Sequence, residues 1–238
     1  MKIARCTPSR GLVHSRTEQT ADTARDWAEL HGHQWRNFWT HDLPIPDCFN
    51  EVVGMAYNWG ADLVWILEED VVLRSPGVTF PAMVSTIANG ADVAIVDYTV
   101  GSLANGFSRG IARDGANRIG WAPTGCILIK RVCFDRLPRP WFTTRGRALR
   151  ESGEVTWQSD TPIAYGVDVE FTHALRQMGF NLQEVKARCD HLRVVATGQL
   201  ETNDGRHRIE PLPVTHERSI VPPRVPLSRS NEHDSICR

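Results

Sequence analysis

The chain has 238 residues, of which 41% are hydrophobic and 23% charged, and its formal net charge is −1. This composition is typical of a globular protein with one large domain or two small ones. The charge gives no general attraction to nucleic acid or anionic lipid. No apolar run approaches the ~18 residues of a transmembrane segment, and the first residues lack the apolar stretch of a secretory signal. The six cysteines form no C-x-x-C pair, so we expect free thiols and a cytoplasmic location.

Strand and helix patterns alternate through the first 70 residues. Patterns typical of strands cover residues 2–6, 34–40 and 63–67, and helical patterns cover residues 17–30 and 47–58. The third strand is a continuous apolar run, which indicates burial on both faces of a sheet. This alternation predicts an α/β fold with a mostly parallel central sheet flanked by helices.

Three carboxylates, Glu68, Glu69 and Asp70, follow the third strand directly. In open α/β sheets, ligands bind beyond the carboxyl ends of the strands. Carboxylates this close repel one another unless a cation joins them, and oxygen ligands suit Mg²⁺ or Mn²⁺. One hypothesis is therefore a divalent metal that holds a phosphorylated substrate. The alternative is an acidic, solvated strand end.

Two loops are expected at the same rim of the sheet. After the first strand, Thr7 and Ser9 can donate to a base or ribose, and Arg10 can pair with phosphate. A plain turn is the alternative for this loop. Asp42 follows the second strand and can accept a hydrogen bond from a base or ribose. The glycine motifs of Rossmann and P-loop phosphate sites are absent.

The pattern of strands and helices continues after the acids. We expect a helix over residues 76–89, a strand over 91–96 and an irregular loop over 101–116. A strand, a turn and a second strand are expected over 119–131. The turn contains Gly125, a position that suggests close approach of the backbone to another group.

The elements beyond residue 131 are shorter. A short helix is expected at residues 132–137, and a polar stretch at 143–160 is either a solvated loop or a surface insertion that acts as a lid. A helix over 165–178 has Asp168 in its first turn, where the helix dipole favours a carboxylate. That preference is one explanation of this residue, and a catalytic base is the other. A strand over 180–185 follows.

The composition changes near residue 200. Residues 201–238 are rich in Pro and Arg and show no hydrophobic period. We therefore predict a single domain over 1–200 and an extended or disordered tail over 201–238. Wrapping of the domain, contact with an acceptor and homo-oligomer formation are the roles open to this tail.

The order of the motifs resembles that of GT-A glycosyltransferases, most like the family-2 group of nucleotide-sugar transferases. The resemblance covers residues 2–195. The pieces that carry it are Thr7-Pro8-Ser9-Arg10, Pro46-Asp47-Cys48-Phe49-Asn50, Leu67-Glu68-Glu69-Asp70-Val71, Pro123-Thr124-Gly125-Cys126, Gly166-Val167-Asp168-Val169-Glu170-Phe171 and Asp190-His191. Each piece is weak alone, whereas their order and spacing together are fairly specific. The resemblance implies a GT-A fold and a nucleoside-diphosphate sugar as donor.

The resemblance also implies a metal site. The Glu68 to Asp70 segment matches the D-x-D motif of that group, with Glu in place of the first Asp. Asp70 would ligate the metal, and Glu68 would lie near the ribose or the metal. His191 matches a downstream histidine that completes the metal shell. The implied cofactor is Mn²⁺ or Mg²⁺.

The other implied roles concern the base and the substrates. Asp168 matches the acid that acts as the base in inverting members, Val167 replaces the Glu that precedes it there, and Glu170 is the other candidate. The implied nucleotide contacts are Thr7, Pro8, Ser9, Arg10, Asp42, Asn50, Glu68 and Glu69. The implied acceptor or sugar contacts are Trp121, Thr124 and Gly125.

The predicted function is metal-dependent transfer of a sugar from a nucleoside-diphosphate sugar to an unidentified acceptor hydroxyl. A UDP-sugar is the default donor by analogy, and inversion with Asp168 as base is the expected mechanism. A nucleotidyltransferase is one alternative, although the loop after the first strand has a single glycine. A non-catalytic module that binds a nucleotide or sugar is the other, because the acid motif is irregular and the Glu before Asp168 is missing.

Overall fold

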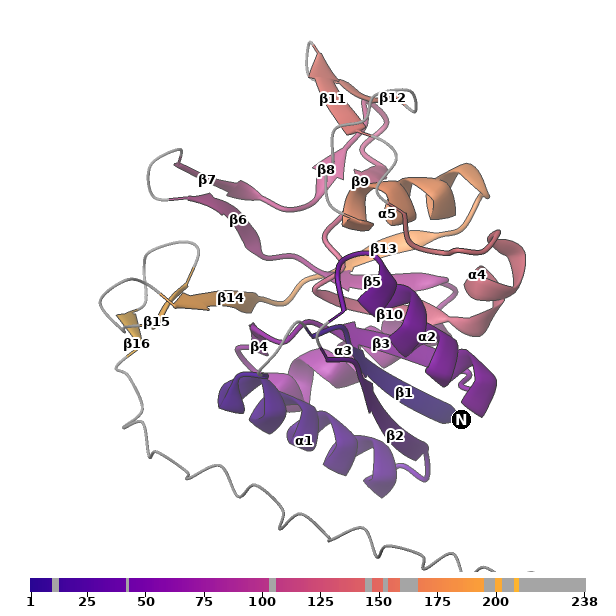
Figure 1. Cartoon of the computed structure of the whole chain (residues 1–238), viewed down its shortest axis with the longest axis vertical. Helices are drawn as coiled ribbons and strands as arrows, with labels where there is room; N and C mark the ends of the chain where they lie inside the picture. The colour runs from indigo at the N-terminus through magenta and orange to yellow at the C-terminus, as the bar shows by residue number, and fades with distance from the viewer. Residues whose placement is uncertain are drawn as a thin grey trace, which may run out of the picture.

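The computed structural model describes residues 1–9, 13–41, 43–102, 106–143, 147–151, 154–158, 167–194, 200–202 and 208–209. A six-stranded sheet with the order β13-β5-β10-β3-β1-β2 forms the core of the fold (Figure 1). Its strands are β1 Lys2–Thr7, β2 Gln34–Trp39, β3 Leu63–Leu67, β5 Val93–Val96, β10 Cys126–Lys130 and β13 Leu182–Val185. Neighbouring strands are parallel except where β10 pairs with β3 and β5. The predicted fold class, an α/β fold with a mostly parallel central sheet flanked by helices, is confirmed.

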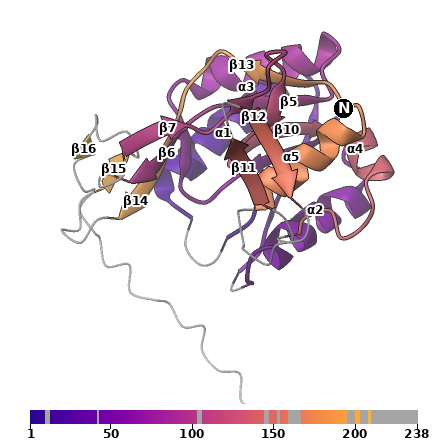
Figure 2. The ribbon, with the colours of Figure 1, turned by 90° about the horizontal axis from the view of Figure 1, so that it is seen from above.

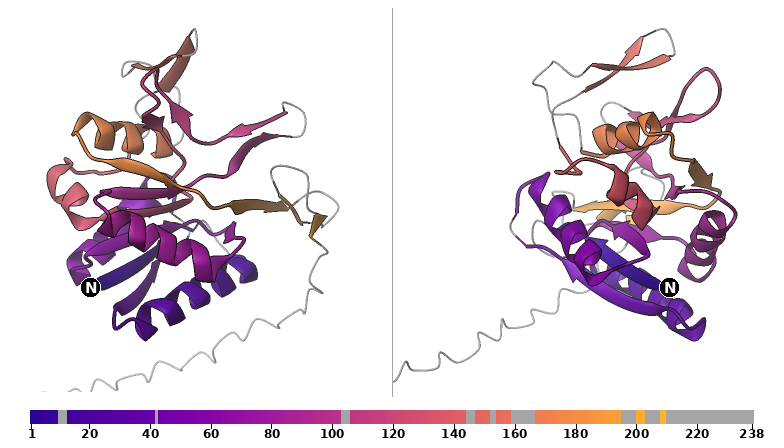
Figure 3. Two further views of the ribbon diagram at one scale, coloured as in Figure 1. Left: turned by 180° about the vertical axis from the view of Figure 1, so that it is seen from behind. Right: turned by 90° about the vertical axis from the view of Figure 1, so that its right-hand side faces the viewer.

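Helices cover both faces of the sheet, because side chains alternate along each strand. The helices are α1 Ser15–Leu30, α2 Asp47–Trp59, α3 Pro76–Ala88, α4 Arg131–Arg136 and α5 Val167–Gln177. In β3, Val64 and Ile66 pack in the cluster with α2, α4 and α5, whereas Trp65 packs in the cluster with α1 and α3. Figure 3 shows α2 and α3 on opposite sides of the sheet. The sheet is therefore the middle of three layers.

Local sequence explains where the helices begin and end. The His14 side chain caps α1 by accepting from the Arg16 N–H, and Pro76 occupies the first turn of α3. Gly60 ends α2 with a φ of 80°, a left-handed conformation that glycine adopts at little cost. These bounds lie within two residues of those predicted for the three helices. No helix in the described part of the chain has the length and apolar character needed to cross a bilayer.

Short strands outside the sheet replace two predicted loops. The region 101–116, expected to be irregular, takes part in the hairpins β6 Thr99–Ser102 with β7 Gly106–Arg109 and β8 Ala112–Arg113 with β9 Ile119–Trp121. The polar stretch 143–160 contains the hairpin β11 Arg147–Glu151 with β12 Glu154–Gln158. β6–β7 and β11–β12 extend away from the central sheet in Figure 1, and Figure 2 shows β6–β7 to one side of the molecule. Ladders of two to five residues are too short to impose a visible hydrophobic period.

A second, antiparallel sheet continues from the acidic segment. β4 Val71–Leu73 pairs with β14 Cys189–Val194, which pairs with β15 Leu200–Thr202, and β15 pairs with β16 Arg208–Ile209. β14 thus returns a late part of the chain to the residues that follow β3. β15 and β16 also cross the boundary predicted at residue 200, so the division between domain and tail stays a prediction.

Candidate active site

The three acids occupy a tight turn between β3 and β4. The Glu68 N–H donates to the Gly125 carbonyl at 3.0 Å, and the Val71 N–H donates to the Glu68 carbonyl at 3.2 Å. Because β10 is antiparallel to β3, the start of β10 lies at the same rim as the end of β3, with Cys126 paired to Leu67. The turn at residues 123–125 therefore lies next to the acids.

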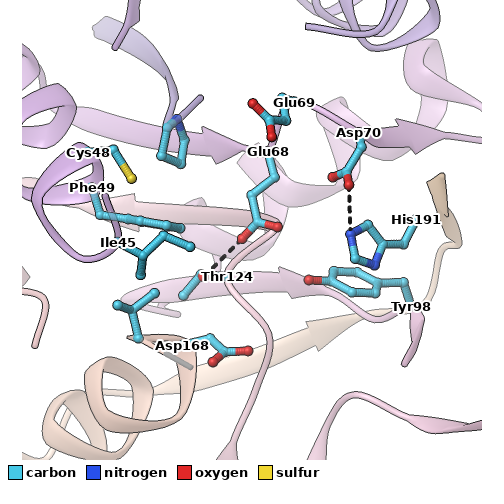
Figure 4. A pocket seen from close by; sticks show the side chains of 12 residues that line it. Ile45, Cys48, Phe49, Glu68, Glu69, Asp70, Tyr98, Thr124, Asp168 and His191 are labelled. Carbon is cyan, nitrogen blue, oxygen red and sulfur yellow. Dashed lines mark hydrogen bonds and ion pairs between the residues drawn. The ribbon is translucent and has the colours of Figure 1, made fainter. Parts of the chain in front are cut away.

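His191 reaches the acids through the pairing of β14 with β4. In this pairing His191 stands opposite Val71, and the Leu192 N–H donates to the Asp70 carbonyl at 2.8 Å. The His191 Nε2 lies 3.1 Å from Asp70 Oδ2. Figure 4 shows this contact at the edge of the pocket. A residue more than 120 positions later in the sequence thus completes the acidic cluster.

Glu68, Asp70 and His191 form a group that could hold a metal ion. One ligand atom from each side chain lies within 4.8 Å of the other two. Burial raises the pKa of the Glu68 carboxyl to about 7, against the opposing effect of His191. A cation would offset this cost of keeping Glu68 ionised. Two carboxylates and an imidazole are donors that suit a first-row divalent ion such as Mn²⁺.

A pocket of about 270 Å³ opens at the carboxyl ends of the parallel strands. It is lined by Pro8, Ile45, Cys48, Phe49, Glu68, Glu69, Asp70, Tyr98, Thr124, Val167, Asp168 and His191. The residues from the ends of β1 and β2 and from α2 are apolar, whereas those around the turn after β3 are acidic or polar (Figure 4). The pocket can therefore hold an apolar or planar group at one side and a polar, charged group at the other.

Asp168 enters the pocket from the first turn of α5, across from the acids (Figure 4). Its carboxylate accepts from the Val169 N–H at 3.0 Å, and burial raises its pKa above the ordinary value of 3.8. Thr172 fixes this end of the helix, because its hydroxyl donates to the Asp168 carbonyl at 2.7 Å and accepts from the Ala122 N–H at 3.0 Å. A partly desolvated carboxylate in a cleft has the character of a proton acceptor.

The structure brings seven of the predicted residues to one pocket. These are Pro8, Glu68, Glu69, Asp70, Thr124, Asp168 and His191. Ser9 contacts this set, because its hydroxyl donates to Glu69 Oε2 at 2.5 Å. Thr124 is bonded to Glu68, with 3.4 Å between its hydroxyl and Oε1. Ser9 and Glu69 thus join the loop after β1 to the acidic turn.

Other predicted residues lie outside the set that lines the pocket. The Asn50 amide holds the main chain of Phe142, with hydrogen bonds of 2.8 and 3.0 Å. Thr7 is buried at the end of β1, Trp121 ends β9, and Glu170 lies in the first turn of α5. Arg10 and Asp42 lie outside the described residues. The predicted substrate contacts of all these residues stay predictions.

Tyr98, Ile45, Cys48 and Phe49 line the pocket but were not predicted as site residues. A signal for Tyr98 was present, because it follows β5 just as the acids follow β3. Cys48 and Phe49 belong to the motif that opens α2. Their apolar side chains gave no chemical reason to select them.

Comparison with known proteins supports the fold. A197 from STIV superimposes with a TM-score of 0.57 at 15% sequence identity, over 89% of this chain and 95% of that chain. Lower TM-scores of 0.32 and 0.38 relate the chain to a glycosyltransferase involved in the glycosylation of the major capsid of PBCV-1 (11% identity, 59% of this chain, 70% of that one) and to CMP:2-keto-3-deoxy-manno-octonic acid synthetase complexed with CTP (10% identity, 77% and 88%). No protein-family model and no curated protein matches the sequence. The likeness to A197, at 15% identity, concerns the fold alone.

Proposed function

We propose that the protein is a metal-dependent glycosyltransferase that moves a sugar from a nucleoside-diphosphate sugar, by default a UDP-sugar, to an acceptor hydroxyl. The observation that carries this proposal is the meeting of Glu68, Asp70 and His191 where the turn after β3 lies beside β14, with Asp168 across the same pocket. Glycosyl transfer needs two parts: a cation group, here the three side chains of Glu68, Asp70 and His191 that could bind a metal ion, and a proton acceptor across the pocket, here Asp168.

The acidic side of the pocket would serve the leaving group. Glu68, Asp70 and His191 would hold Mn²⁺ or Mg²⁺, which supplies positive charge to the diphosphate as the glycosidic bond breaks. Asp70 and His191 are already oriented toward one another, so their side chains require little reorganisation. The apolar wall formed by Pro8, Ile45 and Phe49 would pack against the nucleoside.

Asp168 would serve the acceptor. Its carboxylate takes the proton of the acceptor hydroxyl as the oxygen attacks the anomeric carbon from the face opposite the leaving group. The product then has inverted configuration. Partial desolvation raises the pKa of Asp168, which makes it a stronger base than an exposed aspartate.

A thermal-shift panel tests the proposal. UDP, GDP, dTDP and CDP are compared with and without Mn²⁺, using the wild type, Asp70→Ala and the remote helix variant Asp26→Ala. A ligand that binds the folded state alone at a hundred times its dissociation constant adds about 2.7 kcal/mol of stability. We expect one nucleotide to stabilise the wild type and Asp26→Ala in the presence of Mn²⁺, and to leave Asp70→Ala unshifted. The absence of any Mn²⁺-dependent shift in the wild type would contradict the proposal.

The released product separates the proposal from its alternatives. Incubation with the matching nucleotide sugar and Mn²⁺ should release a nucleoside diphosphate. Release of pyrophosphate from a nucleoside triphosphate and a sugar phosphate would indicate a nucleotidyltransferase instead. Binding without either product, across a panel of glycan, lipid and small hydroxyl acceptors, would favour a non-catalytic module.

A further inference from the structure

Tyr98 is a polar pocket residue for which the proposed reaction has no role so far. It follows β5, is 7% exposed and lines the pocket. Its hydroxyl points toward the space beside Glu68, Thr124 and Asp168 (Figure 4). Within the described part of the chain, its hydroxyl forms no hydrogen bond, although its carbonyl accepts from Gly110. A buried hydroxyl that faces a pocket without a protein partner is positioned for a ligand.

Packing fixes the position of this hydroxyl. A Cβ atom at Gly125 would lie 2.6 Å from the Tyr98 oxygen, so the absence of a side chain at Gly125 makes the space that Tyr98 fills. On the other side, the rings of Tyr98 and His191 are 5.1 Å apart. Asp97 tightens the segment by accepting from the N–H groups of Gly110 and Ile111, both at 3.1 Å. The donor is therefore held in place before any ligand arrives.

The neighbours of the hydroxyl determine what it can bind. Glu68 and Asp168 accept hydrogen bonds when ionised, and the Thr124 hydroxyl both donates and accepts. A phosphate oxygen placed between Glu68 and Asp168 with no cation beside it would be repelled, and an apolar group would leave these carboxylates unsatisfied. A group that offers donors and acceptors on adjacent carbons, as a sugar ring does, matches the arrangement.

We propose that Tyr98 determines donor specificity by donating a hydrogen bond to a hydroxyl oxygen of the transferred sugar. This inference rests on the proposed function, and it gives the polar side of the pocket a sugar-binding role in addition to its cation group. Tyr98 makes the contact through its hydroxyl, whereas its ring packs against His191 and Gly125. Removal of the oxygen alone should therefore affect the sugar contact and leave the packing intact.

Calorimetric titration of the full chain with Mn²⁺ tests the inference. The variants are Tyr98→Phe and the matched control Tyr57→Phe, whose hydroxyl bonds Asp135 at 2.8 Å outside the pocket. The ligands are UDP, UDP-glucose, UDP-galactose and UDP-N-acetylglucosamine, or the same set on another base if the nucleotide panel selects one. We expect Tyr98→Phe to bind at least one sugar nucleotide roughly 3- to 10-fold more weakly, as for the loss of one hydrogen bond. Its affinity for UDP, and all affinities of Tyr57→Phe, should match the wild type.

Three results would overturn the inference. If Tyr98→Phe binds every sugar nucleotide as tightly as the wild type, the hydroxyl does not contact the sugar. If it weakens UDP and the sugar nucleotides equally, the hydroxyl serves the nucleotide or the cation group. If the wild type binds none of the nucleotides, the proposed function itself fails and the sugar contact fails with it. The UDP measurement on the wild type distinguishes that failure from the other two.

Discussion

Asp168 is the side chain on which the proton transfer of the proposed reaction depends. Replacing it with Asn keeps the size and the hydrogen bond from Val169 while removing the ability to accept a proton. We expect turnover to fall by about 100-fold or more, and the Mn²⁺-dependent nucleotide shift to persist. Initial rates of nucleoside-diphosphate release, together with the thermal shift, measure both effects. Burial raises the pKa of Asp168 above 3.8, so the base becomes protonated at a higher pH than an exposed aspartate would. As the pH is lowered, the activity of the wild type should therefore begin to fall before pH 3.8 is reached.

Glu170 provides the comparison for that experiment, because it is the other acid in the first turn of α5. Asp168 lines the pocket, whereas Glu170 is outside the residues that line it in the described part of the chain. Glu170→Gln should therefore retain far more turnover than Asp168→Asn. The opposite order, with Asp168→Asn active and Glu170→Gln inactive, would transfer the role of base to Glu170.

Single residues differ in how well the sequence predicted their surroundings. The acids were found because a buried apolar strand ends at them, and the structure places them at the rim of the sheet. Asn50 was selected by its place in a motif, yet its amide is bonded to Phe142, a partner 92 positions away that no local pattern reveals. The position of the Tyr98 hydroxyl likewise depends on Gly125, which tertiary folding brings beside it. Positions at strand ends were predictable, but their partners were not.

At the scale of elements, an ion pair between a buried arginine and a partly exposed glutamate joins the first strand to the first helix. Both terminal nitrogens of Arg5 on β1 donate to Glu18 on α1, at 2.8 and 2.6 Å. The Arg5 side chain is 3% exposed, whereas that of Glu18 is 47% exposed. Glu18→Gln removes the negative charge beside a buried guanidinium. We expect a loss of about 1–2 kcal/mol in the free energy of unfolding at pH 7, less than for a fully buried pair because solvent screens Glu18.

The pH dependence of this loss identifies its cause. The hydrogen bond from Arg5 lowers the pKa of Glu18 below its ordinary value of 4.5, so the folded state binds fewer protons than the unfolded state near that pH. The stabilisation is complete above pH 4.5 and disappears as the pH falls through the folded pKa. In urea unfolding, the difference in free energy of unfolding between wild type and Glu18→Gln should therefore be larger at pH 7 than below pH 4. The exposed helix variant Glu29→Gln should stay within about 0.5 kcal/mol at both pH values, and a constant loss for Glu18→Gln would contradict the ion-pair explanation.

The elements themselves follow a physical division. The strands of the large sheet and helices α1, α2 and α3 have apolar periods long enough to recognise, and their predicted bounds agree closely with those of the structure. The hairpins β6–β7 and β11–β12 lack such a period, because their strands have four or five residues each. The antiparallel direction of β10 was also beyond the sequence pattern. That direction matters for function, since it places Thr124 and Gly125 at the same rim as Glu68.

At the scale of the whole molecule, the pocket depends on contacts between distant parts of the chain. Its lining runs from Pro8 to His191, and the two hydrophobic clusters of the core run from Ile3 to Cys189. Predicting the fold required only the strands and helices of the central sheet, whereas predicting the cation group also required the pairing of β14 with β4. A pattern of alternating strands and helices predicts the central sheet, but it contains no information about the pairing of β14 with β4. The resemblance to GT-A enzymes supplied His191 at the level of sequence.

The extent of the pocket predicts the effect of removing the end of the chain. A variant that ends at Ile209 keeps every residue that lines the pocket and all of the second sheet. The residues removed, 210–238, have the Pro- and Arg-rich composition of segments that bury little apolar surface. We expect the melting temperature to change by less than about 3 °C, which corresponds to roughly 1 kcal/mol for a chain of this size. The Mn²⁺-dependent nucleotide shift should equal that of the full chain when both are measured in parallel.

A lower melting temperature with a retained nucleotide shift would show that the tail stabilises the domain, and loss of the shift would show that the tail belongs to the site. Light scattering on both proteins tests the homo-oligomer separately, since a change of mass per particle on truncation would assign the subunit contact to residues 210–238.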